Sequence, residues 1–179
     1  MTNNSQKRRP PRSDQAPSDF FYLLREGTHA LQRGKVEMAV ELLERAYRLE
    51  ADNVDVTLNL AGAYILAKKF RGAVELLEVL VKREPHNPMI WTNLAAAYLG
   101  NPVLAKDEDH AQAIAAFEKA LELDPATPNV AYNLGLIYVD RQENDQALYW
   151  FKRAVEANPQ DRDARNYLKK LSDDEAGKR

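Results

Sequence analysis

The chain repeats itself with a period of 34 residues, and this self-similarity constrains its fold more than any other feature. Small residues recur at spacings of 34, 34 and 40, at Gly27, Ala61, Ala95 and Gly135. A second series recurs at spacings of 34, 40 and 34, at Ala39, Ala73, Ala113 and Ala147. Because one unit of this length cannot bury its apolar residues alone, successive units stack on one another. The sequence therefore predicts a stacked array of four similar units.

The period is interrupted once, by six extra residues in the third unit. Tyr64 and Tyr98 keep the spacing of 34, whereas Ala113 arrives six residues late. The insertion therefore lies near 100–109, where Gly-Asn-Pro is a strong turn signal. The acidic residues that follow suit the first turn of a helix, whose dipole favours carboxylates.

Each unit contains two helical patterns. In the second unit Val56, Leu60, Ala63 and Tyr64 recur at spacings of three and four, which gives one apolar face. A second pattern follows and ends before Pro85, because proline cannot continue a helix. No stretch alternates with a period of two, so the sequence predicts an all-α protein.

These residues resemble the tetratricopeptide-repeat (TPR) family. The third unit carries the family signature as Trp91, Leu94, Ala95, Tyr98, Ala113, Phe117, Ala120 and Pro125. The fourth unit repeats it without the tryptophan. The first unit departs from it, with Ala30 and Ala51 at the tyrosine and proline positions. The resemblance implies an α-solenoid, a right-handed superhelix of four TPR helix-turn-helix repeats.

The expected organisation follows from the repeat boundaries. We place the TPR repeats at 20–53, 54–87, 88–127 and 128–161, and a C-terminal capping helix at 162–171. This last segment is amphipathic, with Ala164, Leu168 and Leu171 on its apolar side, as a solvated terminal helix requires. Residues 1–19, a basic tail, and residues 172–179 are expected to be disordered.

The resemblance also implies that the first helix of each repeat lines a concave groove. One groove position holds Arg25, Asn59, Asn93 and Asn133, and the three asparagines form an amide ladder. An amide has both donors and an acceptor, so it can pair with the backbone of an extended peptide. The neighbouring positions are apolar: Phe21, Leu24, Leu58, Leu66, Met89, Tyr132 and Leu136.

Two alternatives stay open for this groove. Asparagine is common at this position in the family whether or not a peptide binds, and some of the apolar residues could instead pack beneath the N-terminal segment. The family's co-chaperones clamp a C-terminal carboxylate with lysines, arginines and asparagines, whereas here Leu24 and Met89 stand at lysine positions. We therefore expect a mixed polar and apolar ligand, such as an amphipathic helix, in place of a chaperone tail.

Composition excludes several other classes of function. The net charge is −2, so no overall field attracts nucleic acid or a membrane, and the absence of cysteine removes thiolate sites. The basic residues Lys7, Arg8, Arg9 and Arg12 are not followed by an apolar stretch, unlike those of a signal peptide. No run of 18 apolar residues is present, so we expect a cytoplasmic protein without membrane insertion.

No constellation of residues indicates chemistry. The contiguous residues Asp107 to His110 point in different directions on a helix, so we expect no metal there. The sequence has no phosphate-binding loop and no nucleophile beside a base, so we expect neither an enzyme nor a cofactor. Trp150 lies on a second helix, where packing is favoured over contact with a partner.

The leading hypothesis is a non-enzymatic adaptor that binds a peptide or helical segment of a partner protein in its groove. The alternative is a self-associating scaffold whose groove takes the N-terminal segment of a neighbouring chain, because Phe20, Phe21 and Tyr22 follow the tail directly. Under this alternative the protein is a homo-oligomer.

Overall fold

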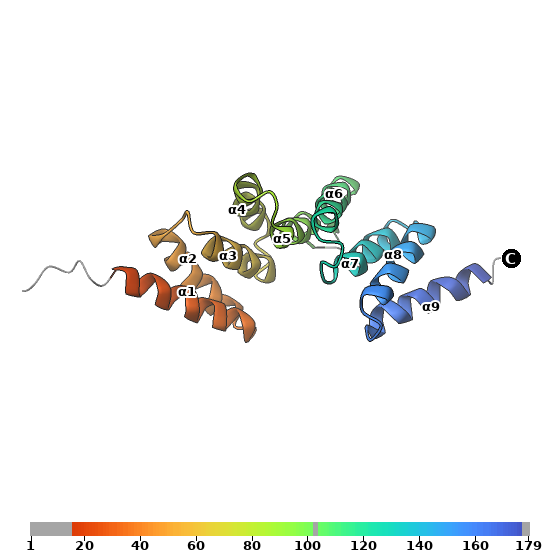
Figure 1. Ribbon diagram of the computed structural model, residues 1–179, viewed down its shortest axis with the longest axis horizontal. Coiled ribbons are helices and arrows are strands. Elements are labelled where there is room, and N and C mark those ends of the chain that lie inside the picture. The colour runs from red at the N-terminus through yellow and green to blue at the C-terminus, as the bar shows by residue number, and fades with distance from the viewer. Residues whose placement is uncertain (1–15, 102–103, 177–179) are drawn as a thin grey trace, which may run out of the picture.

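A computed structural model describes residues 16–101 and 104–176, and the structural statements below concern these ranges. They form nine α-helices in an elongated row, with α1 at one end and α9 at the other (Figure 1). The helices are α1 (Ala16–Gln32), α2 (Val36–Leu49), α3 (Val54–Leu66), α4 (Phe70–Arg83), α5 (Pro88–Leu99), α6 (Asp107–Leu123), α7 (Val130–Asp140), α8 (Asn144–Ala157) and α9 (Arg162–Ala176).

The first eight helices form four successive hairpins, which confirms the predicted all-α fold of four repeats. In three of them the short turn between the helices contains a left-handed residue: Gly34 (φ 70°), Lys68 (φ 59°) and Gln142 (φ 61°). The third hairpin instead carries the insertion, and Gly100 at the end of α5 has a positive φ (58°) with ψ −124°, a conformation that favours glycine. The acidic residues predicted for a helix start form the first turn of α6.

Close contact between paired helices explains the series of small residues. A Cβ atom added to Gly27 would lie 2.7 Å from Cγ of Leu43, and one added to Gly135 would lie 2.8 Å from the ring of Phe151. Leu43 and Phe151 are both fully buried. The glycines therefore let α1 approach α2, and α7 approach α8, closely enough to enclose these two side chains.

Contacts between successive hairpins use a second repeated position. Val56, Ile90 and Val130 occupy it in α3, α5 and α7 and are fully buried, as is Ala164 at the same position of α9. Helix α9 therefore packs like the first helix of a further repeat. At the position of Gly135, however, α9 carries Lys169, which is exposed and leaves no room for a second helix at that distance. The predicted capping helix is confirmed.

Both predicted tails are shorter than expected. Helix α1 begins at Ala16, four residues before the predicted boundary, and Phe20 in its second turn is fully buried. A proline in the first turn is compatible with this start, because its missing N–H would have no partner there. Helix α9 continues to Ala176, held by buried Leu171 and by the Ser172 hydroxyl, which donates to the Leu168 carbonyl at 2.8 Å. The disorder predicted for 1–15 and 177–179 lies outside the described residues.

A tyrosine–glutamate hydrogen bond joins successive repeats at two places. The Tyr64 hydroxyl donates to Glu44 Oε1 at 3.0 Å, and the Tyr98 hydroxyl donates to Glu78 Oε1 at 2.9 Å. Burial raises the pKa of each tyrosine to about 12, and the glutamate it bonds adds to the rise. The folded protein therefore holds these phenolic protons more tightly than the unfolded chain does.

We expect this pair of bonds to make stability fall at alkaline pH. A raised folded-state pKa stabilises the fold below the unfolded value of 10.0, and this contribution is lost as the pH rises from 10 to about 12. The variant with both Tyr64→Phe and Tyr98→Phe should lose stability less steeply across that interval. Chemical denaturation at several pH values measures this slope. Equal slopes for the parent and the variant would contradict the assignment.

Candidate functional site

The amide ladder is built by three half-buried asparagines, one on each of α3, α5 and α7. The Asn59 amide donates to the Asp55 carbonyl at 2.8 Å, and the Asn93 amide donates to the Met89 carbonyl at 2.9 Å. These bonds fix both side chains against their own helices. Among the described residues, the Asn133 amide makes no side-chain hydrogen bond. Asn59 and Asn93 therefore each leave an amide oxygen free to accept a hydrogen bond, and Asn133 leaves both the oxygen and the NH₂ group of its amide available to a ligand.

The first-repeat equivalent of these asparagines is Arg25, which is exposed and directed along its own helix. Its Nε lies 3.1 Å from Glu26 Oε1, and its guanidinium lies 5.8 Å from the centre of the Tyr22 ring. This position offers a partly compensated positive charge, in contrast to the neutral amides of the later repeats.

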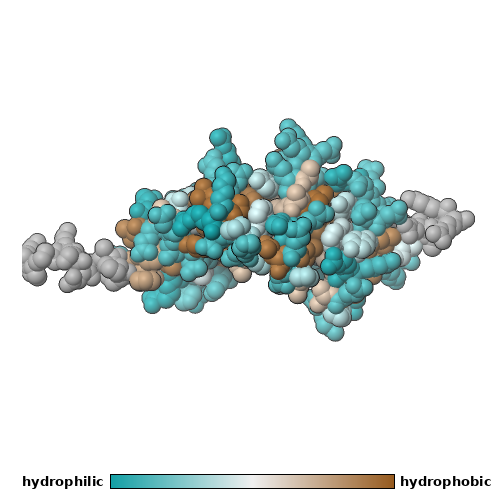
Figure 2. Space-filling view, turned by 45° about the horizontal axis from the view of Figure 1, so that its top comes forward, coloured by the Kyte–Doolittle hydropathy of each residue, from teal (hydrophilic) through white to brown (hydrophobic). Residues whose placement is uncertain are grey.

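The predicted apolar groove residues divide into an open set and a covered set. Phe21, Leu66 and Met89 are 64%, 56% and 58% exposed, respectively. The half-buried members pack against core clusters: Leu24, Leu58, Tyr132 and Leu136. Figure 2 shows hydrophobic residues reaching one face of the molecule in separate patches among hydrophilic ones. The exposed apolar residues Phe21, Leu66 and Met89 lie on α1, α3 and α5, respectively.

Helix α9 accounts for the partial burial at α7. Tyr132 lies edge-on to Phe151 (ring centroids 5.7 Å apart) and to Tyr167 of α9 (6.3 Å), and Leu136 joins the same cluster. Burial raises the pKa of Tyr132, and Tyr167, Asp163 and Asp161 add to the rise. The side chains around Tyr132 thus include the two carboxylates at the start of α9.

The remaining candidates have structural roles. Trp150 is only 7% exposed and packs in the core cluster of the third and fourth repeats, as predicted. Asp109 accepts a hydrogen bond from the Lys106 N–H at 2.9 Å, at the start of α6. His110 is buried, and among the described residues neither of its ring nitrogens has a hydrogen-bond partner. In the same ranges no group of three or more acidic or histidine side chains is placed to hold a metal.

A cavity of about 330 Å³ between the loops of the third and fourth repeats was missed by the sequence reasoning. It lies between the α6–α7 loop and the end of α8, and Tyr132 of α7 forms part of its wall. Three alanines that line it, Ala126, Ala131 and Ala157, replace Asp52, Thr57 and Arg83 at the corresponding positions of the first two repeats. Aligning the repeats for small residues at loop positions would have located it.

Comparison with protein families yields two matches that together span most of the chain. Two models described as "Tetratricopeptide repeat" match residues 30–100 and 102–162. Among curated proteins, anaphase-promoting complex subunit 3 of Schizosaccharomyces pombe is 36% identical over 53 residues. That alignment spans 30% of this chain and 8% of the relative.

Solved structures of similar fold cover most of the chain. MamA of AMB-1 superposes with a TM-score of 0.68 at 26% identity, over 89% of this chain and 84% of MamA. A thermophilic TPR protein of Thermus thermophilus superposes with a TM-score of 0.74 at 24% identity, over 85% of this chain and 80% of that protein, which supports the fold alone. Within the described ranges, none of the helices combines the length and apolar character needed to cross a bilayer.

Proposed function

The chain belongs to the tetratricopeptide-repeat family, and on that basis we propose that it is a non-enzymatic adaptor that binds a peptide or helical segment of a partner protein along the first helices of its repeats. Proteins of this family generally act as protein–protein interaction scaffolds. The curated relative, too, is named as a subunit of a complex.

The observation that carries the proposal is that exposed apolar side chains lie on the same helices as the ladder asparagines, one or two turns away from them. Asn59 and Asn93 are held by bonds to their own helices, which leaves each amide oxygen able to accept a hydrogen bond. Leu66 lies two turns after Asn59 on α3, and Met89 lies one turn before Asn93 on α5. Both side chains are more than half exposed. Backbone donors of a ligand can pair with the amides while its apolar side chains cover Leu66 and Met89.

We expect replacement of Asn59, Asn93 and Asn133 by alanine to weaken peptide binding by about tenfold or more, because each lost hydrogen bond costs about 0.5–1.5 kcal/mol. Peptides selected from a random displayed library on the parent protein would be titrated against the variant by calorimetry. Helical content should stay unchanged, since these side chains lie outside the buried core.

The matched control is Gln112→Ala, which removes an exposed amide side chain from α6, a second helix that does not carry the ladder. It should leave every affinity unchanged. Selected peptides that bind the triple variant as tightly as the parent would show that the ladder is not the binding surface.

The alternative is a self-associating scaffold, and the exposure of Phe21 (64%) and Tyr22 (56%) at the first helix favours it. Light scattering of the parent chain and of the variant with Phe21→Ser and Tyr22→Ser distinguishes the two proposals. A concentration-dependent mass that disappears in the variant supports the scaffold, whereas a monomeric parent excludes it.

A further inference from the structure

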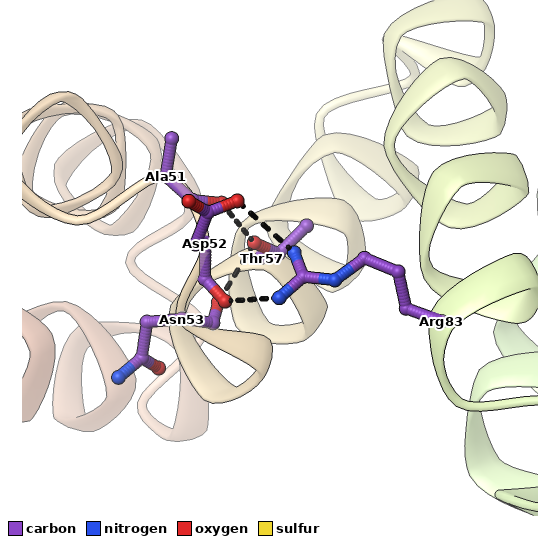
Figure 3. A network of polar contacts seen from close by, with 5 residues as sticks. All are labelled: Ala51, Asp52, Asn53, Thr57 and Arg83. Atoms are coloured by element: carbon purple, nitrogen blue, oxygen red, sulfur yellow. Dashed lines mark hydrogen bonds and ion pairs between the residues drawn. The ribbon is translucent and has the colours of Figure 1, made fainter.

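A network of polar contacts joins the α2–α3 loop, between the first two repeats, to the end of α4. The Arg83 guanidinium donates to the Asp52 carbonyl at 2.7 Å, and its other nitrogen lies 3.5 Å from Asp52 Oδ1 (Figure 3). The Thr57 hydroxyl donates to the carbonyls of Asn53 at 2.8 Å and of Ala51 at 3.3 Å. A cation at the end of α4 and a hydroxyl on α3 thus satisfy the carbonyl groups of the α2–α3 loop.

The cavity lies at the equivalent place between the third and fourth repeats. The residues that correspond to the five in Figure 3 all line it: Pro125, Ala126, Thr127, Ala131 and Ala157. Ala157 stands where Arg83 would be and Ala126 where Asp52 would be, so both partners of the ion pair are missing. The space that a guanidinium fills between the earlier loops is open here.

The same substitutions leave acceptors without donors. Between the second and third repeats, Trp91 stands at the position of Thr57, and its Nε1 donates to the Pro85 carbonyl at 2.8 Å. In the fourth repeat this position is Ala131, which has no donor. Among the described residues, no donor reaches the carbonyls of Pro125 or Ala126. The carbonyls of Pro125 and Ala126 in the cavity wall therefore have no donor within the described part of the chain, whereas the junction of the first two repeats satisfies both equivalent carbonyls and the next junction satisfies that of Pro85.

The charges around the cavity also favour a cation. Glu156 and Asp161 line it, and within the described part of the chain the single positive group in its wall is Arg153. The Arg153 guanidinium lies over the Trp150 ring, 5.3 Å from the ring centre. Glu156 has no ion-pair partner among the described residues, whereas Asp161 Oδ1 accepts two backbone N–H groups at the start of α9.

We propose that this cavity binds an arginine side chain of the partner's segment, which takes the place that Arg83 fills between the first two repeats. The proposal rests on the adaptor function proposed above and adds a chemical requirement on the ligand. Tyr132 lines both the cavity and the predicted groove beside Asn133, so a segment lying along the ladder can extend one side chain into it.

Arginine suits the cavity better than lysine. Its planar guanidinium has five donors in a fixed fork, and the cavity wall offers the two carbonyls and the Glu156 carboxylate as separated acceptors. A guanidinium also stacks on aromatic rings more readily than an ammonium, and Tyr132 provides such a ring. A lysine ammonium is a compact, strongly hydrated charge that gains less from this arrangement.

Ethylguanidinium ion serves as the test probe, with ethylammonium as a control of equal charge. Titrated into the isotope-labelled full chain, ethylguanidinium should shift the backbone amide signals of residues 126–132 and 157–161 saturably. Ethylammonium should bind there at least about tenfold more weakly. The absence of saturable shifts, or equal shifts around Asp107 to Asp109, would overturn the proposal.

A variant that fills the cavity from within provides the matched control. Combining Ala126→Asp, Ala131→Thr and Ala157→Arg places the three polar side chains of the Figure 3 network between the third and fourth repeats, so that the introduced arginine can occupy the cavity. It should fold with parental helicity and lose the saturable shifts. Retained binding in the folded variant would show that the probe sits elsewhere, and contradict the proposal.

The two proposals fail in separate experiments. If no selected peptide depends on the amide ladder, the adaptor function fails whatever the probe does. If peptides do depend on the ladder, their affinity should drop about tenfold when one arginine is replaced by citrulline, which keeps the shape and removes the charge. Ladder-dependent peptides that bind the cavity-filled variant as tightly as the parent would refute the cavity assignment alone.

Discussion

Gly135→Leu should destabilise the fourth repeat by about 3 kcal/mol or more, because Gly135 is buried where α7 meets α8. A Cβ atom at this position would already lie 2.8 Å from two carbon atoms of the Phe151 ring. That ring cannot move away, because it stacks on Tyr167 with centroids 4.8 Å apart and an angle of 4° between the planes. Helices α7 and α8 must therefore separate, and the cluster beneath α9 must open.

The chain supplies its own control for this prediction. Gly62 also lies inside a first helix, yet a Cβ added there would meet only Cδ2 of Leu31 at 3.9 Å, which is ordinary contact. Gly62→Ala should therefore stabilise the protein by about 0.5–1 kcal/mol, because alanine replaces glycine in a helix interior. Gly135→Ala should destabilise it by about 1–3 kcal/mol. Urea denaturation measures all three variants, and the same sign for the two alanine substitutions would contradict the helix packing described here.

The repeat pattern was sufficient to predict the fold because its landmarks have direct steric causes. Gly135 and Phe151 are found at their spacing since one makes room for the other, so the spacing in the chain encodes the contact. The six-residue insertion was located in the same way, and it lengthens both the α5–α6 connection and the start of α6. The predictions for the helix ends were less accurate. Helix α9 extends five residues beyond its predicted end, because buried Leu171 and the Ser172 bond stabilise the last turns.

The site was less predictable because side-chain direction depends on neighbouring helices. Asn59 and Asn133 occupy the same repeat position, yet only Asn59 bonds to its own helix. Tyr132 and Leu136 were expected to line an open groove, and α9 partly buries both. The burial of Tyr132 and Leu136 comes from α9, which packs on α7 as the first helix of a further repeat would. The ladder and the apolar positions remain predictions of the binding surface.

The fourth repeat begins differently from the second and third, and the repeat pattern did not predict this difference. Asn53 and Asn87 accept N–H groups of the helices they precede, at 3.2 and 3.0 Å. The equivalent Thr127 instead donates its hydroxyl to the Asp124 carbonyl at 2.7 Å. Helix α7 then starts two residues later than α3 and α5 do, after Asn129 in the left-handed conformation (φ 62°). Helices α6 and α7 consequently pack together less extensively than the helices at the other junctions.

This weak junction should limit how far a core defect spreads. Phe151→Ala removes a fully buried ring from the fourth repeat and should cost about 3–5 kcal/mol. In a repeat protein each unit is stabilised by its own core and by its contacts with neighbours, so unfolding stops at the junction with the weakest contacts. We expect amide hydrogen exchange to accelerate in α7, α8 and α9 while α1 to α4 keep their protection.

Phe117→Ala is the matched comparison, since Phe117 holds the same position in the third repeat and is equally buried. That repeat is joined to the second by the Tyr98–Glu78 hydrogen bond and by the core cluster that α4 and α5 share. The loss of its ring should therefore accelerate exchange toward both ends of the array and lower the midpoint of the main unfolding transition. In the Phe151→Ala variant, by contrast, a separate early transition should appear, because Phe151 packs in the cluster of α7, α8 and α9 and lies outside the core cluster that the third and fourth repeats share. Uniform loss of protection in both variants would show instead that the four repeats unfold as one cooperative unit.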